Sequence, residues 1–235
     1  MSRRRILLAN QTQGGGGFSP LDLNPNLWLD ATDASTITEV SGAISQWDDK
    51  SGNNYNVSQS DVTKRPTNGG SINGLNAIDL GGGLNKKRLV TTTASNNNWQ
   101  DVYMVLRWDG SSSFNWANII TALNSSGTSF GIGLTGYSNT NYFYTITWLD
   151  DLFINTVPTS LTAPAIGVGN PLNSNALLSF SADNAINVNG FGVGGGRNND
   201  DSWYGVIGEV VAFPRKLSAT ERGQMNTYLT NKWGL

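Results

Sequence analysis

Carboxylates are the side chains of this sequence best suited to catalysis, because the chain contains neither histidine nor cysteine. Without imidazole and thiol groups there is no Ser-His-Asp or Cys-His catalysis, no disulfide, no thiolate or imidazole metal ligand and no histidine pH switch. An acid pair for glycoside hydrolysis would have to come from the 17 Asp and Glu residues. Only Glu39, Glu209 and Glu221 are glutamates, and they lie far apart in the sequence. We therefore expect a protein that is not an enzyme and has no catalytic residues.

Oxygen donors for calcium are plentiful, and calcium requires about six to eight of them at one site. The acidic candidates are Asp30, Asp33, Asp48, Asp49, Asp200 and Asp201. None of them falls in an EF-hand alternation, and Asp residues in Gly/Asn-rich loops commonly hydrogen-bond their own backbone. We expect no cofactor and no metal site, with a bound calcium ion as the alternative that stays open.

Aromatic side chains beside polar loops are the candidates for carbohydrate binding, because an exposed ring can stack on a sugar while nearby amides hydrogen-bond its hydroxyls. Trp99, Trp116, Tyr137 and Trp203 have this setting, as does Trp148. Burial, or contact with another protein, is the alternative for each of them. The remaining tryptophans lie in apolar or motif segments and are expected in the core; they are Trp28, Trp47, Trp108 and Trp233.

The first 19 residues have the composition of an anchoring arm rather than of a signal peptide. A basic head, Arg3, Arg4 and Arg5, precedes the apolar residues Ile6, Leu7, Leu8 and Ala9. This apolar run is shorter than the roughly 7–15 residues of a secretory signal. Polar residues and then Gly14 to Gly17, a flexible hinge, follow it. We expect residues 1–19 to be an arm that anchors residues 20–235, and a tail without a role is the alternative.

The rest of the chain predicts one β domain, because short apolar segments alternate with Gly, Asn, Asp and Ser clusters. The clearest strands are 101–108, 117–123, 142–149, 175–181 and 204–213. In the first of these, Val102, Met104, Leu106 and Trp108 share one face, because strand side chains alternate. That face is expected in the core.

One helix is predicted, from Ala219 to about Lys232. Ser218 and Glu221 form a capping box at its start, and Gly234 is placed to end it. We expect a β sandwich with this helix on its edge or rim.

These segments resemble concanavalin A-like, laminin-G-like jelly-roll domains of the bacterial and bacteriophage virion-protein type. The ending carries the resemblance: a G-x-I-G-E strand at 205–209, L-S-x-x-E-R at 217–222 and Y-L-x-x-K-W-G at 228–234. The opening agrees in Leu27-Trp28-Leu29-Asp30-Ala31 and in the segments 44–52, 65–66 and 73–78. The resemblance implies an all-β jelly roll of two antiparallel sheets with one C-terminal helix.

The resemblance does not settle activity, since this fold carries many functions. The glucanase branch of the family has an E-x-D-x-x-E strand, whereas Glu209 has Ile207 and Val211 as its same-face neighbours. We therefore expect a structural role for Glu209. A net charge of −2 argues against nucleic acid as a partner, and no stretch approaches the roughly 20 apolar residues of a membrane span.

We expect a bacteriophage virion component, made in the host cytoplasm and exposed on the particle exterior as a head decoration, fibre or tail-associated protein. Its partners would be other virion proteins, bound through Arg3 to Leu8, and host cell-surface glycans. Several copies per particle are expected, with a trimer as one option. A secreted bacterial adhesin or carbohydrate-binding module is the alternative, and a glycoside hydrolase or lyase is the third hypothesis.

Overall fold

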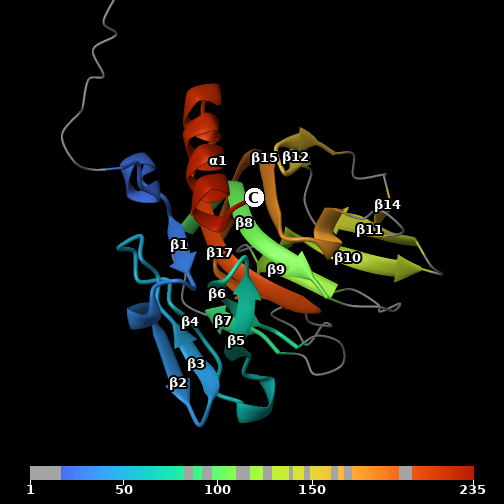
Figure 1. The fold of residues 1–235 in the computed structure, drawn as a ribbon. Helices are drawn as coiled ribbons and strands as arrows, with labels where there is room; N and C mark the ends of the chain where they lie inside the picture. Colours follow the sequence, from blue (N-terminus) through green and yellow to red (C-terminus); the bar gives the residue numbers. More distant parts are fainter. Residues whose placement is uncertain are drawn as a thin grey trace, which may run out of the picture.

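The computed structural model describes residues 17–81, 87–91, 97–109, 117–123, 129–137, 140–145, 149–159, 164–166, 171–195 and 203–235. Within these ranges the chain forms two antiparallel sheets and one C-terminal α-helix (Figure 1). The mostly-β class, the two antiparallel sheets and the terminal helix predicted from the sequence are confirmed.

The first sheet, sheet A, holds the strands that lie under the helix. Its order is β13-β12-β15-β8-β17-β6-β5, and β1 pairs with β17 beside β6. The strands are β13 (Val157–Pro158), β12 (Leu149–Ile154), β15 (Ala176–Val188), β8 (Asn97–Trp108), β17 (Gly205–Phe213), β6 (Leu75–Asp79), β5 (Thr67–Ile72) and β1 (Leu27–Asp30).

The second sheet, sheet B, has the order β14-β11-β10-β9-β16-β7-β4-β3-β2. Its strands are β14 (Pro164–Ile166), β11 (Thr140–Thr145), β10 (Ser129–Tyr137), β9 (Ala117–Leu123), β16 (Gly190–Val193), β7 (Leu89–Thr91), β4 (Val57–Ser58), β3 (Ala43–Trp47) and β2 (Ile37–Val40). Short 3₁₀ turns join strands at η1 (Pro20–Leu23), η2 (Ala34–Thr36), η3 (Val62–Lys64) and η4 (Pro171–Asn173).

Strand β8 shows how the two sides of sheet A are used. Val102, Met104 and Leu106 lie in the core cluster between the two sheets, as their alternation predicts. The opposite face is buried as well, because Tyr103 and Val105 belong to a second cluster with the helix. Sheet A is therefore covered on both faces, and the tryptophans predicted for the core are at most 7% exposed.

Helix α1 (Ala219–Trp233) lies across the outer face of sheet A (Figure 1). Its buried residues Met225, Leu229 and Trp233 pack against Tyr103 and other outward-facing residues of the sheet. The predicted position on the edge or rim is therefore wrong, because β8 and β17 have apolar residues on both faces and the outer one requires a cover.

Two predicted strands differ in extent. The predicted strand 142–149 is divided, since β11 ends at Thr145 and β12 begins at Leu149. The strand predicted for 175–181 continues as far as Val188, because after a shift in register the residues 186–188 pair with the start of β8.

Candidate functional site

Two of the loop tryptophans predicted to bind glycans lie in the interior. Trp99 and Trp203 are each 0% exposed, so both predictions are wrong. The ring of Trp99 packs against Phe191 at 4.8 Å, and the ring of Trp203 packs against Trp108 at the same distance. Their polar neighbours in the sequence flank strand ends, where a large ring can turn inward and gain more from burial than from water.

The other predicted site residues are not tested by the structure. Trp116 and the anchoring residues Arg3, Arg4, Arg5, Ile6, Leu7 and Leu8 lie outside the described residues. Tyr137 ends strand β10, and only its backbone is described. None of the described helices is long and apolar enough to cross a membrane.

Helix α1 is held at both ends by the groups that the sequence predicts. The Ser218 hydroxyl accepts from the Glu221 amide, and the Glu221 carboxylate accepts from the Ser218 amide at 2.8 Å. Gly234 ends the helix with a φ of 65°, a left-handed conformation that favours glycine. Asn73, in the β5–β6 turn, donates to the carbonyls of Trp233 and Gly234 at 2.8 and 3.0 Å. These contacts fix the helix on sheet A.

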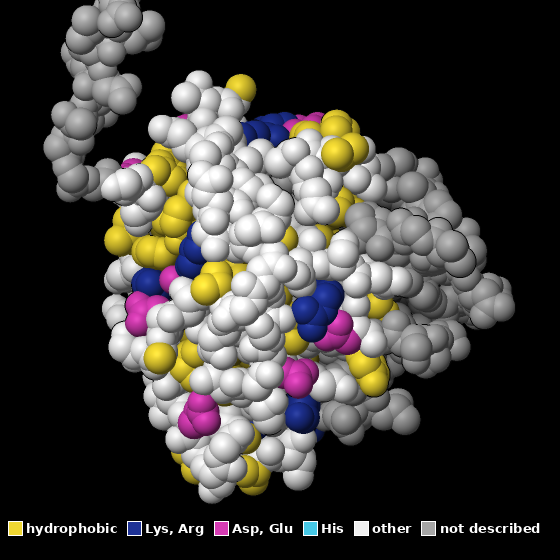
Figure 2. Space-filling view, in the orientation of Figure 1, with side chains coloured by type: hydrophobic (Ala, Val, Ile, Leu, Met, Phe, Trp, Pro, Cys, Tyr) yellow, Lys and Arg dark blue, Asp and Glu magenta, His cyan; other side chains and the backbone are white. Residues whose placement is uncertain are grey.

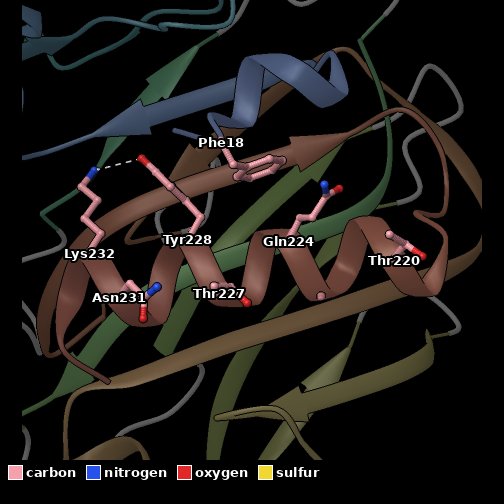
Figure 3. Close-up of a pocket in the computed structure, with 8 residues that line it drawn as sticks. Phe18, Thr220, Gln224, Thr227, Tyr228, Asn231 and Lys232 are labelled. Atoms are coloured by element: carbon pink, nitrogen blue, oxygen red, sulfur yellow. Dashed lines mark hydrogen bonds between the residues drawn. The ribbon is translucent and has the colours of Figure 1, made fainter. Parts of the chain in front are cut away.

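An open groove of about 810 Å³ runs along the outer side of α1 and is closed on one side by Phe18 (Figure 3). Its remaining lining comes from the helix: Thr220, Gly223, Gln224, Thr227, Tyr228, Asn231 and Lys232. The Phe18 ring meets the Tyr228 ring edge-on, with centroids 6.0 Å apart. Phe18 comes just before η1, whose capping box of Ser19 and Asp22 fixes the chain as it leaves the groove.

Four uncharged polar side chains form a stripe on the groove side of α1, with spacings of four, three and four residues. They are Thr220, Gln224, Thr227 and Asn231, which we call the polar stripe. All four are exposed, and within the described part of the chain their side-chain donors and acceptors have no partner. Figure 2 shows the surface over α1 almost free of charge, with a hydrophobic patch beside it. The groove thus combines two rings with unpaired amides and hydroxyls.

A buried carboxylate lies beneath the groove. Glu209 on β17 is 0% exposed and accepts four hydrogen bonds. Its Oε1 accepts from Trp28 Nε1 at 2.7 Å and from the Tyr228 hydroxyl at 3.1 Å. Its Oε2 accepts from Lys232 Nζ at 2.8 Å and from Trp233 Nε1 at 2.7 Å. Burial, with the Glu209 charge as the next cause, raises the pKa of the Tyr228 hydroxyl far above its usual value, so the phenol stays neutral.

Asp30, on β1, is the second acid of this cluster. It lies directly opposite Glu209 in the β1–β17 pairing and is 4% exposed. Lys232 Nζ contacts Asp30 Oδ1 at 2.8 Å, and Lys50 Nζ contacts Asp30 Oδ2 at 3.1 Å. Burial acts to raise the pKa of Asp30, but hydrogen bonding and charge from Lys232, with Thr32 and Lys50, leave it below the usual value.

A second charged cluster holds the other end of α1. Asp101 on β8 is 1% exposed and accepts from the Ser181 hydroxyl at 2.5 Å and from the Leu217 amide at 2.9 Å. Arg222 donates to Ser181 and Asp151 at 3.0 and 3.1 Å. Burial raises the pKa of Asp101 despite these partners. The cluster ties the helix start to β8, β15 and β12.

The described Asp residues considered for calcium have other partners. Asp49 accepts from the amides of Trp28, Ser51 and Tyr55, and Asp33 is bound by Lys50 at 2.8 Å. Within the described ranges no three acidic side chains gather where they could hold a metal ion. Asp200 and Asp201 lie outside those ranges.

The groove was not predicted from the sequence. Its pattern was nevertheless present, because Thr220, Gln224, Thr227 and Asn231 recur on one face of the predicted helix. What the sequence does not show is that Phe18, which lies about two hundred positions earlier, stands beside that face.

No family model matches the chain, and no curated protein is similar to it. The solved structures that resemble it include two of Trypanosoma rangeli sialidase. The one in complex with 2,3-difluorosialic acid, a covalent intermediate, has a TM-score of 0.45 and 13% identity over 93% of this chain and 35% of that chain. The one with the inhibitor DANA has a TM-score of 0.42 and 12% identity over 88% and 33%. The chain thus spans about a third of the length of these structures.

This result contradicts the expectation that the protein is not an enzyme, since sialidases are enzymes. We withdraw that expectation. Its premise was weak on physical grounds, because distance along the sequence does not decide which carboxylates meet: Asp30 and Glu209 lie opposite one another in adjacent strands. The similarity itself assigns no activity and no catalytic residue to this chain.

Proposed function

We propose that the protein is a bacteriophage virion component whose β sandwich binds carbohydrate in the groove beside α1. The observation that carries this proposal is the groove itself, whose lining combines the Phe18 and Tyr228 rings with the unpaired amides and hydroxyls of the polar stripe. Sugars have apolar C–H faces and a rim of hydroxyls, so a site with both kinds of group suits them. Its volume of about 810 Å³ accommodates a short oligosaccharide.

The sandwich in this proposal is a concanavalin A-like jelly roll. The positions of the sequence motifs support it. Gly208 and Glu209, from the G-x-I-G-E strand, contact Trp233 and Lys232, from the K-W-G ending. Asp30, from the opening motif, contacts the same lysine. The motifs thus come together in one cluster, which gives a physical reason for their joint presence in the sequence.

The virion setting rests on the resemblance and on the arm. Residues 1–16 precede Phe18, which lines the groove. If these residues bound a capsid or tail protein, the chain would pass from that protein to the sandwich at a point next to the groove. Deleting residues 1–16 is expected to leave the domain folded, with an unchanged unfolding midpoint, and absent from particles assembled in infected cells. Normal incorporation of the truncated chain would contradict the role of the arm.

Carbohydrate binding is tested by a glycan array with the full chain. The Phe18→Ala and Gln224→Ala variants should each lose at least tenfold in affinity for the glycans that the unaltered protein binds. Tyr204→Ala is the matched control, because Tyr204 is an exposed aromatic residue that does not line the groove. Equal loss in the control, or binding that survives in both groove variants, would contradict this site.

A secreted adhesin or carbohydrate-binding module is the second candidate, and the same groove favours it. The two candidates differ in where the protein is found. Recovery of the chain in purified phage particles supports the first, and recovery only in the medium or on a bacterial surface supports the second.

A further inference from the structure

Lys232 reaches two buried carboxylates at once. Its Nζ lies 2.8 Å from Asp30 Oδ1 and 2.8 Å from Glu209 Oε2. The side chains of Asp30, Glu209 and Lys232 are 5%, 0% and 19% exposed. An amine, an electrophilic carboxyl carbon and a proton acceptor are therefore held together from three different elements, β1, β17 and α1.

The surroundings of these three groups are aromatic. Trp28 donates to one oxygen of Glu209 and Trp233 to the other, and Tyr228 donates to the same carboxylate. Lys232 Nζ also lies 5.4 Å from the centre of the Trp233 ring. Buried charges are costly in such an environment even when they are paired, and an amide between Lys232 and Asp30 removes that one pair of charges.

We propose that Lys232 and Asp30 condense to an intramolecular amide, with Glu209 as the catalytic base. One proton passes from the Lys232 ammonium to Asp30 Oδ1, which leaves a free amine beside a neutral carboxyl group. The amine attacks Asp30 Cγ, and Glu209 takes the second proton from the nitrogen and returns it to Oδ1. The new C–N bond forms as the bond from Cγ to Oδ1 breaks. The two protons lost by the nitrogen leave on Oδ1 as one water molecule, so the step needs no oxidant, reductant or co-reactant.

The two oxygens of Asp30 are already distinguished by their partners. Lys50 Nζ holds Oδ2 at 3.1 Å, where negative charge develops as the amine adds, and this oxygen becomes the amide carbonyl. The Thr32 hydroxyl donates to Oδ1 at 2.7 Å and can pass a proton to it as it leaves. Lys232 also lines the groove, which gives the released water a route to solvent.

The contact between Lys232 and Asp30 raises the rate of amide formation, because two groups held in contact react far faster than the same groups free in solution. The amide would join the first strand of the sandwich to its last helix. Such a link closes nearly the whole domain into one loop, as a structural disulfide does, in a chain that has no cysteine.

The test is the mass of the intact, purified full chain, followed by peptide mapping. We expect a mass lower than that of the sequence by one water molecule, and a branched peptide that joins the segment with Asp30 to the segment with Lys232. Lys232→Arg should have its full sequence mass, because a guanidinium does not form this amide. Lys64→Arg is the matched control and should keep the loss, because Lys64 pairs with Asp61 at the surface.

Asp30→Asn separates the chemistry from the fold. The same attack on an amide carbon expels ammonia, so this variant should fall below its own sequence mass by one ammonia molecule and give the same branched peptide. An unaltered chain at its full sequence mass would overturn the proposal. So would a loss of water that maps to any other pair of residues.

Discussion

Glu209 shows how a single residue can organise the helix and the sheet beneath it. Four donors surround a carboxylate that has no contact with water, and three of them belong to α1. A carboxylate in this state is stable only while its partners remain, because an uncompensated buried charge or donor is expensive. The expected structural role of Glu209 fits these partners, which are two tryptophans, a tyrosine and a lysine.

Glu209→Gln should therefore lower the free energy of unfolding by about 3–5 kcal/mol, since the amide presents N–H groups to donors and removes one of the two carboxylates that pair with Lys232. Urea denaturation of the unaltered protein and of Glu209→Gln measures this difference in unfolding free energy. Glu39→Gln is the matched control, because Glu39 is exposed and accepts only from Asn68 among the described residues. Similar midpoints for the two variants would contradict the role of Glu209.

The ionisation of Glu221 contributes to the loss of folding stability at low pH. Arg215, with the Ser218 backbone and hydroxyl, lowers the pKa of Glu221 from 4.5 to about 2. Because the folded-state pKa is lowered, the ionised group stabilises the fold above pH 4.5, and this contribution disappears as the pH falls toward about 2. The difference in unfolding free energy between the unaltered protein and Glu221→Gln should shrink over that range. A difference that stays constant with pH would contradict this assignment.

At the scale of the elements, the contact between α1 and β17 depends on a glycine. A Cβ on Gly208 would lie 2.5 Å from Cη2 of Trp233, a ring that is 0% exposed and cannot move aside without lifting the helix end. The helix thus packs on β17 at a position where Gly208 leaves room for Trp233. Asn73 closes the same end by donating to the final carbonyls.

Replacing two glycines by alanine should have opposite effects. Gly208→Ala should destabilise the protein by about 1–3 kcal/mol through overpacking against Trp233. Gly223→Ala, inside α1 with nothing within 4 Å of the added carbon, should stabilise it by about 1 kcal/mol through helix propensity. Thermal unfolding of the two variants tests both predictions. A shift of the unfolding midpoint in the same direction in both variants would contradict this account of the contact between α1 and β17.

At the scale of the whole molecule, some features are determined by neighbouring residues in the sequence, and others depend on the complete fold. The helix and its caps, the alternation in β8 and the strand β9 follow from neighbouring residues, and the structure confirms them. The position of the helix does not follow from its own sequence, because it depends on the apolar outer face of sheet A.

The predicted glycan-binding residues differ from the groove residues for the same reason, since exposure and long-range contacts depend on the complete fold. Trp99 and Trp203 lie beside polar residues in the sequence, yet both rings are buried against other aromatic rings. Phe18 and Tyr228 come from opposite ends of the chain and meet only because β1 pairs with β17 and the helix lies above them. Local polarity was therefore a poor guide to exposure, whereas the polar spacing along α1 was a usable signal.

The most direct test of the account is chemical-shift mapping while the full chain is titrated with the oligosaccharide that it binds best on an array. Saturable shifts should concentrate at Phe18 and at Thr220, Gln224, Thr227 and Asn231, with Tyr204 unaffected. Shifts confined to the loops of the sandwich, or no saturable shift with any glycan, would contradict carbohydrate binding in this groove.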